Sequence, residues 1–276
     1  MENKETVLVT GGSGFIATHC IIQLAAAGYN IKATVRDLSR TERLNQIISE
    51  GLKAQNISEF SPVTWHQATL TEDEGWNSAV ADCDFVLHVA SPVAMEMPKN
   101  ENELITPAVE GTKRVLKAAA QAGVKRIVVT SSVAAILYGT EKVEQFTEAD
   151  WTDVDHKSTN AYAKSKTYAE KAAWEFIEND KSGMELACVN PSLVLGPILE
   201  EDFGTSVGMI VEIMSGKYPL VPDMEFGVVD VRDVAALEIL AMTHPEAAGK
   251  RFICSESSMK LKDQTDFLKE LLPEYR

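Results

Sequence analysis

The sequence predicts an α/β protein, a doubly wound parallel sheet with a smaller lobe towards the C-terminus. Short apolar runs rich in β-branched residues alternate with helical patterns over the first 190 residues. Their hydrophobicity is continuous rather than alternating, as strands buried on both faces of a parallel sheet require. A glycine-rich turn follows the first of these runs. After residue 190, glycine and proline punctuate short segments, which is typical of loops that close over a site.

The predicted strands and helices alternate along the chain. We expect strands at residues 7–10, 31–36, 63–66, 85–90, 127–130 and 186–190. A helix is expected at 109–122, because its apolar residues recur at helical spacing and Gly123 can terminate it. Further along, we expect a strand at 226–229, a helix at 231–242, a strand at 251–254 and a helical end at 261–272. Residues 1–190 are therefore predicted to form the main domain, rejoined by about 226–254, and residues 191–276 a smaller lobe.

The composition is that of a folded, acidic protein. Hydrophobic residues make up 45% and charged residues 24% of the 276 positions, close to the averages for globular domains. With 26 Lys and Arg against 41 Asp and Glu, the formal net charge is −15. This charge argues against nucleic acid or an anionic membrane as a partner. The four cysteines lie far apart, without C-x-x-C pairs or histidines at metal-ligand spacing, so we expect reduced thiols and no metal.

The sequence contains no segment typical of membrane insertion or export. No apolar run approaches the roughly 18 residues of a membrane span. The N-terminal residues lead straight into a strand, which leaves no room for a signal peptide. We therefore expect a cytoplasmic protein.

The glycine turn at residues 10–17 is the first candidate binding site. Gly11 allows a sharp turn, Gly14 allows the backbone to approach a pyrophosphate, and Ala17 allows the helix to pack close to the sheet. Free N–H groups at the helix start, near Phe15 and Ile16, would hold the anion. A tight turn without a ligand is the alternative. The strand before the turn, the helix after it and a second strand beyond that helix favour a dinucleotide.

Arg36 at the tip of the second strand indicates which dinucleotide is bound. NAD would favour an acidic residue about 20 positions past the glycines, and Arg36 stands there instead. A guanidinium fits a phosphate in bidentate fashion. We therefore expect NADPH or NADP, with NAD less favoured. The alternative is that Arg36 pairs with the adjacent Asp37 in a solvated salt bridge.

A tyrosine, a lysine and a serine are the candidate proton-transfer residues. Tyr162 and Lys166 are four residues apart, so they lie on one face of a helix. The ammonium of Lys166 should bring the phenol pKa down from about 10 towards the working range. Ser131 and Ser132 follow the fifth strand at its carboxyl end, where open α/β sheets place their chemistry. We choose Ser132 because it lies farther beyond the strand, although serines there can simply form turns.

The chain resembles the extended short-chain dehydrogenase/reductases, and within them the dihydroflavonol reductase and cinnamoyl-CoA reductase group, which includes microbial aldehyde and ketone reductases. The resemblance runs in order from Thr6 to about Cys254. It implies a Rossmann-type fold with an NADP-binding domain and a substrate-binding lobe. The motifs that carry it are residues 10–17, 33–37, His88-Val89-Ala90-Ser91-Pro92, Thr130-Ser131-Ser132, Tyr162 to Lys166 and Asn190-Pro191-Ser192.

The resemblance also implies roles for individual residues. It makes Ser132, Tyr162 and Lys166 the catalytic triad, with Lys166 also binding the nicotinamide ribose. The implied cofactor contacts elsewhere are Ala90 and Ser91 beside the cofactor, Pro191 and Leu193 at the nicotinamide, and Ser206 at a phosphate. His88 is implied only as a buried structural residue.

Two departures from the family pattern stand out. Thr69, before Leu70, replaces the Asp usual on the adenine side, so that contact is either lost or replaced. Relatives usually continue beyond Arg276, so the substrate lobe is expected to be reduced or incomplete.

These features together predict an NADPH-dependent reductase of an aldehyde or ketone. The alternatives are a nucleotide-sugar epimerase or dehydratase on the same scaffold, and a non-catalytic NADP-sensing protein. A hydrophobic carbonyl substrate is suggested by apolar residues in the loops expected at the pocket, namely Val93, Met95, Met97, Ile136, Met209 and Met224. We expect a monomer or a homodimer, paired in the latter case through the helices at 109–122 and 162–177.

Overall fold

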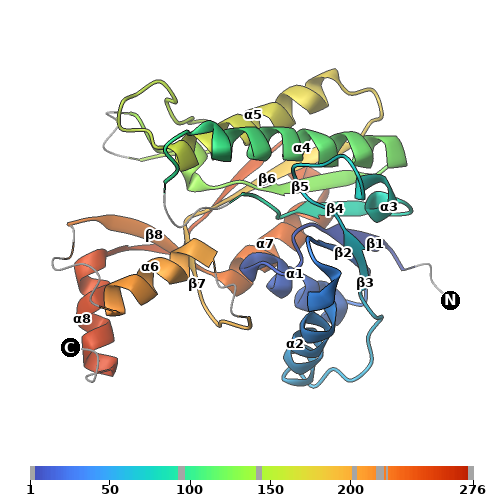
Figure 1. The fold of residues 1–276 in the computed structure, drawn as a ribbon, viewed down its shortest axis with the longest axis horizontal. Helices are drawn as coiled ribbons and strands as arrows, with labels where there is room; N and C mark the ends of the chain where they lie inside the picture. The colour runs from blue at the N-terminus through green and yellow to red at the C-terminus, as the bar shows by residue number, and fades with distance from the viewer. Residues whose placement is uncertain are drawn as a thin grey trace.

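A seven-stranded parallel sheet forms the centre of the computed structural model (Figure 1). The structure describes residues 4–92, 97–140, 145–200, 204–215, 221 and 223–272. The strand order is β3-β2-β1-β4-β5-β6-β9. Successive strands are added on one side of β1 as far as β3, and from β4 onwards they are added on its other side. Its strands are β1 (Thr6–Val9), β2 (Asn30–Val35), β3 (Thr64–Gln67), β4 (Phe85–His88), β5 (Arg126–Thr130), β6 (Glu185–Pro191) and β9 (Arg251–Cys254). This is the doubly wound sheet that the sequence predicts.

Helices cover both faces of this sheet (Figure 1). On one face lie α3 (Trp76–Val80), α4 (Asn102–Ala122) and α5 (Ala161–Asn179), and on the other α1 (Phe15–Ala26), α2 (Thr41–Lys53) and α7 (Val231–Thr243). Short 3-10 helices lie at η1 (Leu38–Arg40), η2 (Val133–Ala135) and η3 (Pro245–Ala247). Because strand side chains alternate, Val7 and Val9 join the core under α1 and α7, whereas Leu8 joins the core under α4. Two apolar cores thus pack against the two faces of the sheet.

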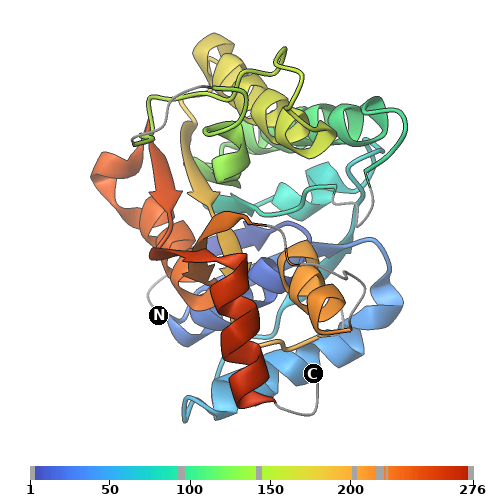
Figure 2. The ribbon, with the colours of Figure 1, turned by 90° about the vertical axis from the view of Figure 1, so that its left-hand side faces the viewer.

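A smaller sheet lies beside the main one (Figure 2). It has the order β10-β8-β7, with β7 (Leu193–Leu195) parallel to β8 (Glu225–Asp230) and β10 (Ser257–Lys260) antiparallel to it. Helices α6 (Gly204–Met214) and α8 (Leu261–Leu271) lie next to this sheet. Of the segment expected to rejoin the main domain, α7 and β9 do so, but β8 belongs to the small sheet. The edge beside β6 is occupied by β9, with Cys188 opposite Arg251.

Helix α4 begins seven residues before the predicted start at 109. Pro107 lies inside it, about one turn from the N-terminus, where a missing N–H removes only a single helical hydrogen bond. The roughly two extra turns bring Glu103 and Leu104 to the cavity described below. None of the described helices is both long and apolar enough to cross a membrane.

Candidate active site

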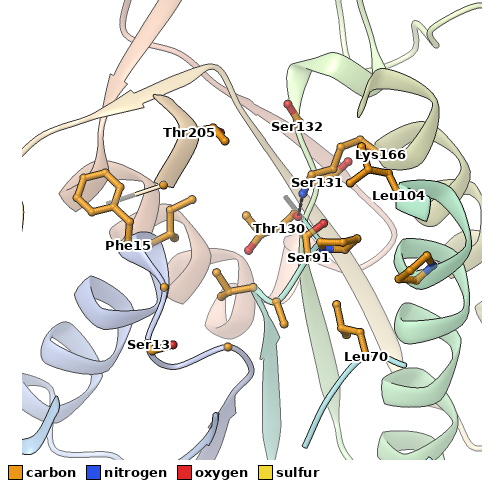
Figure 3. A pocket seen from close by; sticks show the side chains of 18 of the residues that line it. Ser13, Phe15, Leu70, Ser91, Leu104, Thr130, Ser131, Ser132, Lys166 and Thr205 are labelled. Carbon is orange, nitrogen blue, oxygen red and sulfur yellow. Dashed lines mark hydrogen bonds between the residues drawn. The ribbon is translucent and has the colours of Figure 1, made fainter. Parts of the chain in front are cut away.

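A cavity of about 660 Å³ lies at the carboxyl ends of the parallel strands (Figure 3). It reaches from Arg36, beyond β2, past Gly11, beyond β1, to Ser132, beyond β5. This is the crevice where open α/β sheets bind ligands, because the strand order reverses there. Figure 3 shows Phe15 and Ser13 on the α1 side and Leu104 on the α4 side of the same space.

The glycine turn has the geometry of an anion cradle. Gly11 adopts the left-handed conformation, with φ of +67°, and a Cβ there would lie 3.1 Å from Ala90. Gly14 begins α1 without a side-chain cap, and the first turn of α1 contains no acidic residue. The first-turn N–H groups at Phe15 and Ile16 have no partner within the helix. The turn therefore fits the pyrophosphate of a dinucleotide.

Arg36 lies at the cavity edge, as predicted. Its side chain is exposed, and its backbone carbonyl accepts a hydrogen bond from Gln67 Nε2 at 3.0 Å. Asp37 instead accepts the Ser39 N–H at 2.9 Å and caps η1. Over the part of the chain that the structure describes, no salt bridge joins Arg36 to Asp37. Asp37, the alternative partner of Arg36, is bound to the backbone of η1 instead.

Thr69 and Leu70 form the floor of the cavity at this end. Trp76 Nε1 donates to the Thr69 carbonyl at 3.2 Å, and Arg114 Nη1 donates to the Leu70 carbonyl at 2.9 Å. The Thr69 hydroxyl lies 3.2 Å from that of Thr71. Two hydroxyls therefore stand where the family pattern has a carboxylate.

Ser132 and Ser131 differ in their partners. Ser132 is buried and caps η2 by accepting the Ala134 N–H at 3.1 Å. The hydroxyl of Ser131 donates to Glu170 Oε2 at 2.5 Å. Because the Ser131 hydroxyl is already hydrogen-bonded to Glu170, this geometry favours Ser132 as the serine that can contact a ligand.

Helix α5 presents Tyr162 and Lys166 to the same cavity. Asn160 starts the helix by accepting the Ala163 N–H at 2.9 Å. Lys166 Nζ donates to the Thr130 carbonyl at 3.2 Å, the dashed line in Figure 3. Burial lowers the pKa of Lys166 to about 8, opposed by the carboxyl groups of Glu170 and Glu238.

The acidity of Tyr162 differs from the sequence-based expectation. Burial raises the pKa of Tyr162 above its usual value, and the hydrogen bond with Ser132 only partly opposes this effect. The predicted downward shift caused by Lys166 is absent, because Lys166 is directed at the Thr130 carbonyl. The phenol therefore keeps its proton at neutral pH, which is the form that a proton donor needs.

The remaining predicted contacts lie on the cavity, with one exception. Ala90, Ser91, Pro191 and Ser206 all line it. Leu193 does not, whereas its neighbours Ser192 and Val194 do. Side chains alternate along a strand, so Val194 on β7 faces the cavity and Leu193 points elsewhere.

His88 is a structural residue, as expected. It is 2% exposed, and its ring nitrogens contact the Thr10 hydroxyl at 2.9 Å and the Thr112 hydroxyl at 3.3 Å. Thr10 in turn accepts the Ala90 N–H at 3.0 Å. Burial lowers the pKa of His88 to about 3. This neutral histidine ties β1, β4 and α4 together beneath the cavity.

Several lining residues were missed by sequence reasoning. They are Pro98 in the loop before α4, Trp76, the start of α4 (Glu103, Leu104, Pro107) and the start of α6 (Gly204, Thr205). An earlier helix start at Asn102 would have indicated the α4 residues. Of the apolar residues proposed for the pocket, Ile136 is buried core, Met209 is half-buried and Met97 and Met224 are exposed, and none of these four lines the cavity. Val93 and Met95 lie outside the described residues.

The chain belongs to the NAD dependent epimerase/dehydratase family, which residues 7–254 match. Cinnamoyl-CoA reductase 1 of Petunia hybrida is 36% identical over 98% of this chain and 78% of that protein. An anthocyanidin reductase of Vitis vinifera is 32% identical over 99% of this chain and 82% of that protein. The structure of yeast methylglyoxal/isovaleraldehyde reductase Gre2 complexed with NADPH has a TM-score of 0.82 at 30% identity, covering 97% of this chain and 83% of that one.

These similarities confirm the predicted family, fold and enzyme class. The fold is the Rossmann-like α/β sheet of short-chain dehydrogenase/reductases, and the class is oxidoreductase. The predicted dihydroflavonol reductase and cinnamoyl-CoA reductase group also agrees with the relatives found.

Proposed function

We propose that this chain is an NADPH-dependent carbonyl reductase that converts an aldehyde or ketone to an alcohol, with Tyr162 as the proton donor. The observation that carries the proposal is that Ser132, Tyr162 and Lys166 share one cavity with the Gly11 turn. The reductases named above support the reaction, and the NADPH complex of the yeast enzyme supports the cofactor. Arg36 at the cavity edge supports NADPH over NADH.

Each residue has a distinct part in the proposed reaction. NADPH, when bound, supplies the hydride for the carbonyl carbon. The hydroxyl of Ser132 holds the carbonyl oxygen, and Tyr162 donates a proton to that oxygen as it becomes an alkoxide. Lys166, held at the Thr130 carbonyl, contributes a positive charge to the cavity in which the alkoxide forms. The raised pKa of Tyr162 suits reduction, because the phenol is protonated before the reaction.

Reduction is favoured over the dehydratase alternative by the residues after Ser132. A dehydratase needs additional acid-base groups there, but Ala134 and Ala135 are apolar and buried. A sensing protein would have no use for the three proton-transfer residues together. A hydrophobic small molecule is the proposed substrate, in keeping with the apolar side chains of Leu104 and Pro107 on the cavity wall.

The proposal predicts NADPH oxidation that depends on Tyr162. We expect NADPH absorbance to fall with at least one member of a panel of aldehydes, ketones and CoA thioesters. Replacing Tyr162 with Phe should lower kcat about 100-fold or more, because general acid catalysis typically contributes that much. NADPH binding, measured by fluorescence, should change little.

Tyr168 provides a matched control on the same helix. Its side chain is exposed, so Tyr168→Phe should keep the kcat of the natural chain. A Tyr162→Phe variant whose kcat stays within a few-fold would overturn the assignment of the proton donor. An inactive panel in the natural chain would overturn carbonyl reduction itself.

A further inference from the structure

A buried carboxyl group lies behind the proposed active site, on the far face of the sheet. Glu238 of α7 is 0% exposed, and its Oε1 accepts the Thr130 hydroxyl at 2.6 Å. The carbonyl of the same threonine accepts Lys166 Nζ at 3.2 Å. Because α5 and α7 cover opposite faces of the sheet (Figure 1), Thr130 connects Lys166 to Glu238 through β5.

Glu170, the other buried acid near Lys166, has its charge compensated. Arg251 Nε lies 2.5 Å from Glu170 Oε1, and both side chains are buried. Ser131 and Asn190 also donate to Glu170, at 2.5 and 2.8 Å. Its negative charge is therefore held in a fixed network with Arg251, and it raises the pKa of Lys166 more than Glu238 does.

Glu238 has no such compensation. Among the described residues, no arginine or lysine forms an ion pair with it, and its Oε2 has no hydrogen-bond partner. Burying a carboxyl group with so few donors is costly. Burial raises the pKa of Glu238 to about 7, with the Thr130 hydrogen bond and Lys166 opposing the rise. The cation that can use its charge is Lys166.

The other titratable groups that face this pair are uncharged at neutral pH. They are Cys20 from α1, Cys188 from β6, Cys254 from β9 and His88 from β4. Burial raises the pKa of each thiol and lowers that of the imidazole. The charged groups beneath the cavity are therefore Lys166, Glu238 and the ion pair of Glu170 and Arg251.

We propose that Glu238 is a positioning residue for Lys166. Its carboxylate holds Thr130 from the far face of the sheet and stabilises the ammonium form of Lys166 through that strand. The inference rests on the proposed function, since it assigns Lys166 a part in catalysis. Glu238 ionises at about the pH where Lys166 would otherwise begin to lose its proton, so its contribution grows above neutrality.

The Glu238→Gln variant tests this inference, because an amide can still accept from Thr130 but has no charge. We expect the kcat values of variant and natural chain to agree at about pH 6, where Glu238 of the natural chain is protonated and carries no more charge than the glutamine. Above pH 8 the variant should be about three- to ten-fold slower, which corresponds to a Lys166 pKa lowered by roughly 0.5 to 1 unit. A purely structural role would lower kcat equally at every pH.

A second readout does not require turnover. Competitive acetylation of the protein without NADPH, followed by mass spectrometry, gives the pH at which the Lys166 amine becomes reactive. Glu238→Gln should lower that pH by roughly 0.5 unit or more. An unchanged Lys166 titration would overturn the inference even if the enzyme is a reductase. A shifted titration in a chain that reduces no carbonyl would retain the link and overturn the proposed function.

Two further variants serve as a control and as a second test. Asp233→Asn removes one charge from the exposed face of the same helix and should leave the Lys166 titration unchanged. If Glu238→Gln does not fold, Thr130→Val tests the same link, because it removes the donor that favours the carboxylate. Lys166 should then titrate at lower pH than in the natural chain. An unaltered titration in Thr130→Val would count against the inference.

Discussion

At the scale of single residues, cofactor preference in the proposed function depends on Arg36. Its exposed guanidinium lies at the cavity edge, and the neighbouring Asp37 is occupied by the backbone of η1. Arg40, by contrast, forms a 3.0 Å ion pair with Glu200. Arg36 is therefore the arginine best placed to meet a 2′-phosphate.

Replacing Arg36 with Leu should weaken NADPH without weakening NADH. A hydrogen bond to a charged group contributes about 1.5–3 kcal/mol, so the KM for NADPH should rise roughly 10- to 100-fold. The KM for NADH should change by less than about three-fold, because NADH has no phosphate there. Arg43→Leu, which removes a charge from α2 but does not line the cavity, should leave both constants unaltered. An equal loss for both cofactors would contradict this role of Arg36.

The sequence predicted the identity of site residues better than their environment. Spacing alone placed Tyr162 and Lys166 on one helix face, and strand ends placed Ser132 near them. The direction of the Tyr162 pKa was wrong, because it depends on burial and on where Lys166 points, and neither can be read from a spacing of four. Leu193 was misplaced because the residue that faces inward depends on the register of the short strand β7.

At the scale of the elements, the start of α1 is the feature most directly tied to binding. Gly14 has φ of −81°, which any residue can adopt, and a Cβ there would meet only the Gly11 carbonyl at 3.2 Å. Its lack of a side chain is therefore not demanded by the fold alone. A close approach of ligand to this backbone gives the physical reason for the glycine.

Gly14→Ala should accordingly separate binding from stability. We expect a fall of only about 2–4 °C in the thermal midpoint, because φ is unstrained and the one tight contact is that of the Cβ with the Gly11 carbonyl oxygen at 3.2 Å. The Kd for NADPH should rise about ten-fold or more, measured by fluorescence titration. Gly28→Ala is the control, because Gly28 has φ of +87° and open space around it. It should lower stability by about 1 kcal/mol and leave NADPH binding unchanged.

The prediction of strands succeeded where apolar runs mark them. It failed where a strand's place depends on which other strand it pairs with. The six strands of the first 190 residues lie within one or two residues of their expected bounds. Burial on both faces requires continuous apolar runs in the inner strands, whereas β3 is a partly exposed edge strand. Strand β8 was expected to return to the main domain, but it pairs with β7 and β10, whereas β9 lies beside β6. Such pairing involves residues far apart in the chain and leaves no local signal.

At the scale of the whole molecule, the central sheet contains a buried histidine that cannot easily take up a proton. His88 bridges Thr10 and Thr112 at the centre of the sheet, and its pKa is lowered to about 3. In the unfolded chain its pKa would be about 6.5. Between these two values the unfolded state binds a proton that the folded state does not. The contribution of His88 to stability is therefore complete above about pH 6.5 and is lost as the pH falls towards 3.

His88→Gln should flatten the acid limb of the stability curve. Each pH unit below about 6 should cost the natural chain roughly 1.4 kcal/mol through His88, a loss that a glutamine cannot show. Urea unfolding at pH 7 and at pH 5 measures it, and the difference between the two free energies should be smaller in the variant by about 1–2 kcal/mol. His156, which is exposed, supplies the control, and His156→Gln should keep the natural slope. Equal slopes for His88→Gln and the natural chain would show that this histidine is not the group that makes the fold sensitive to acid.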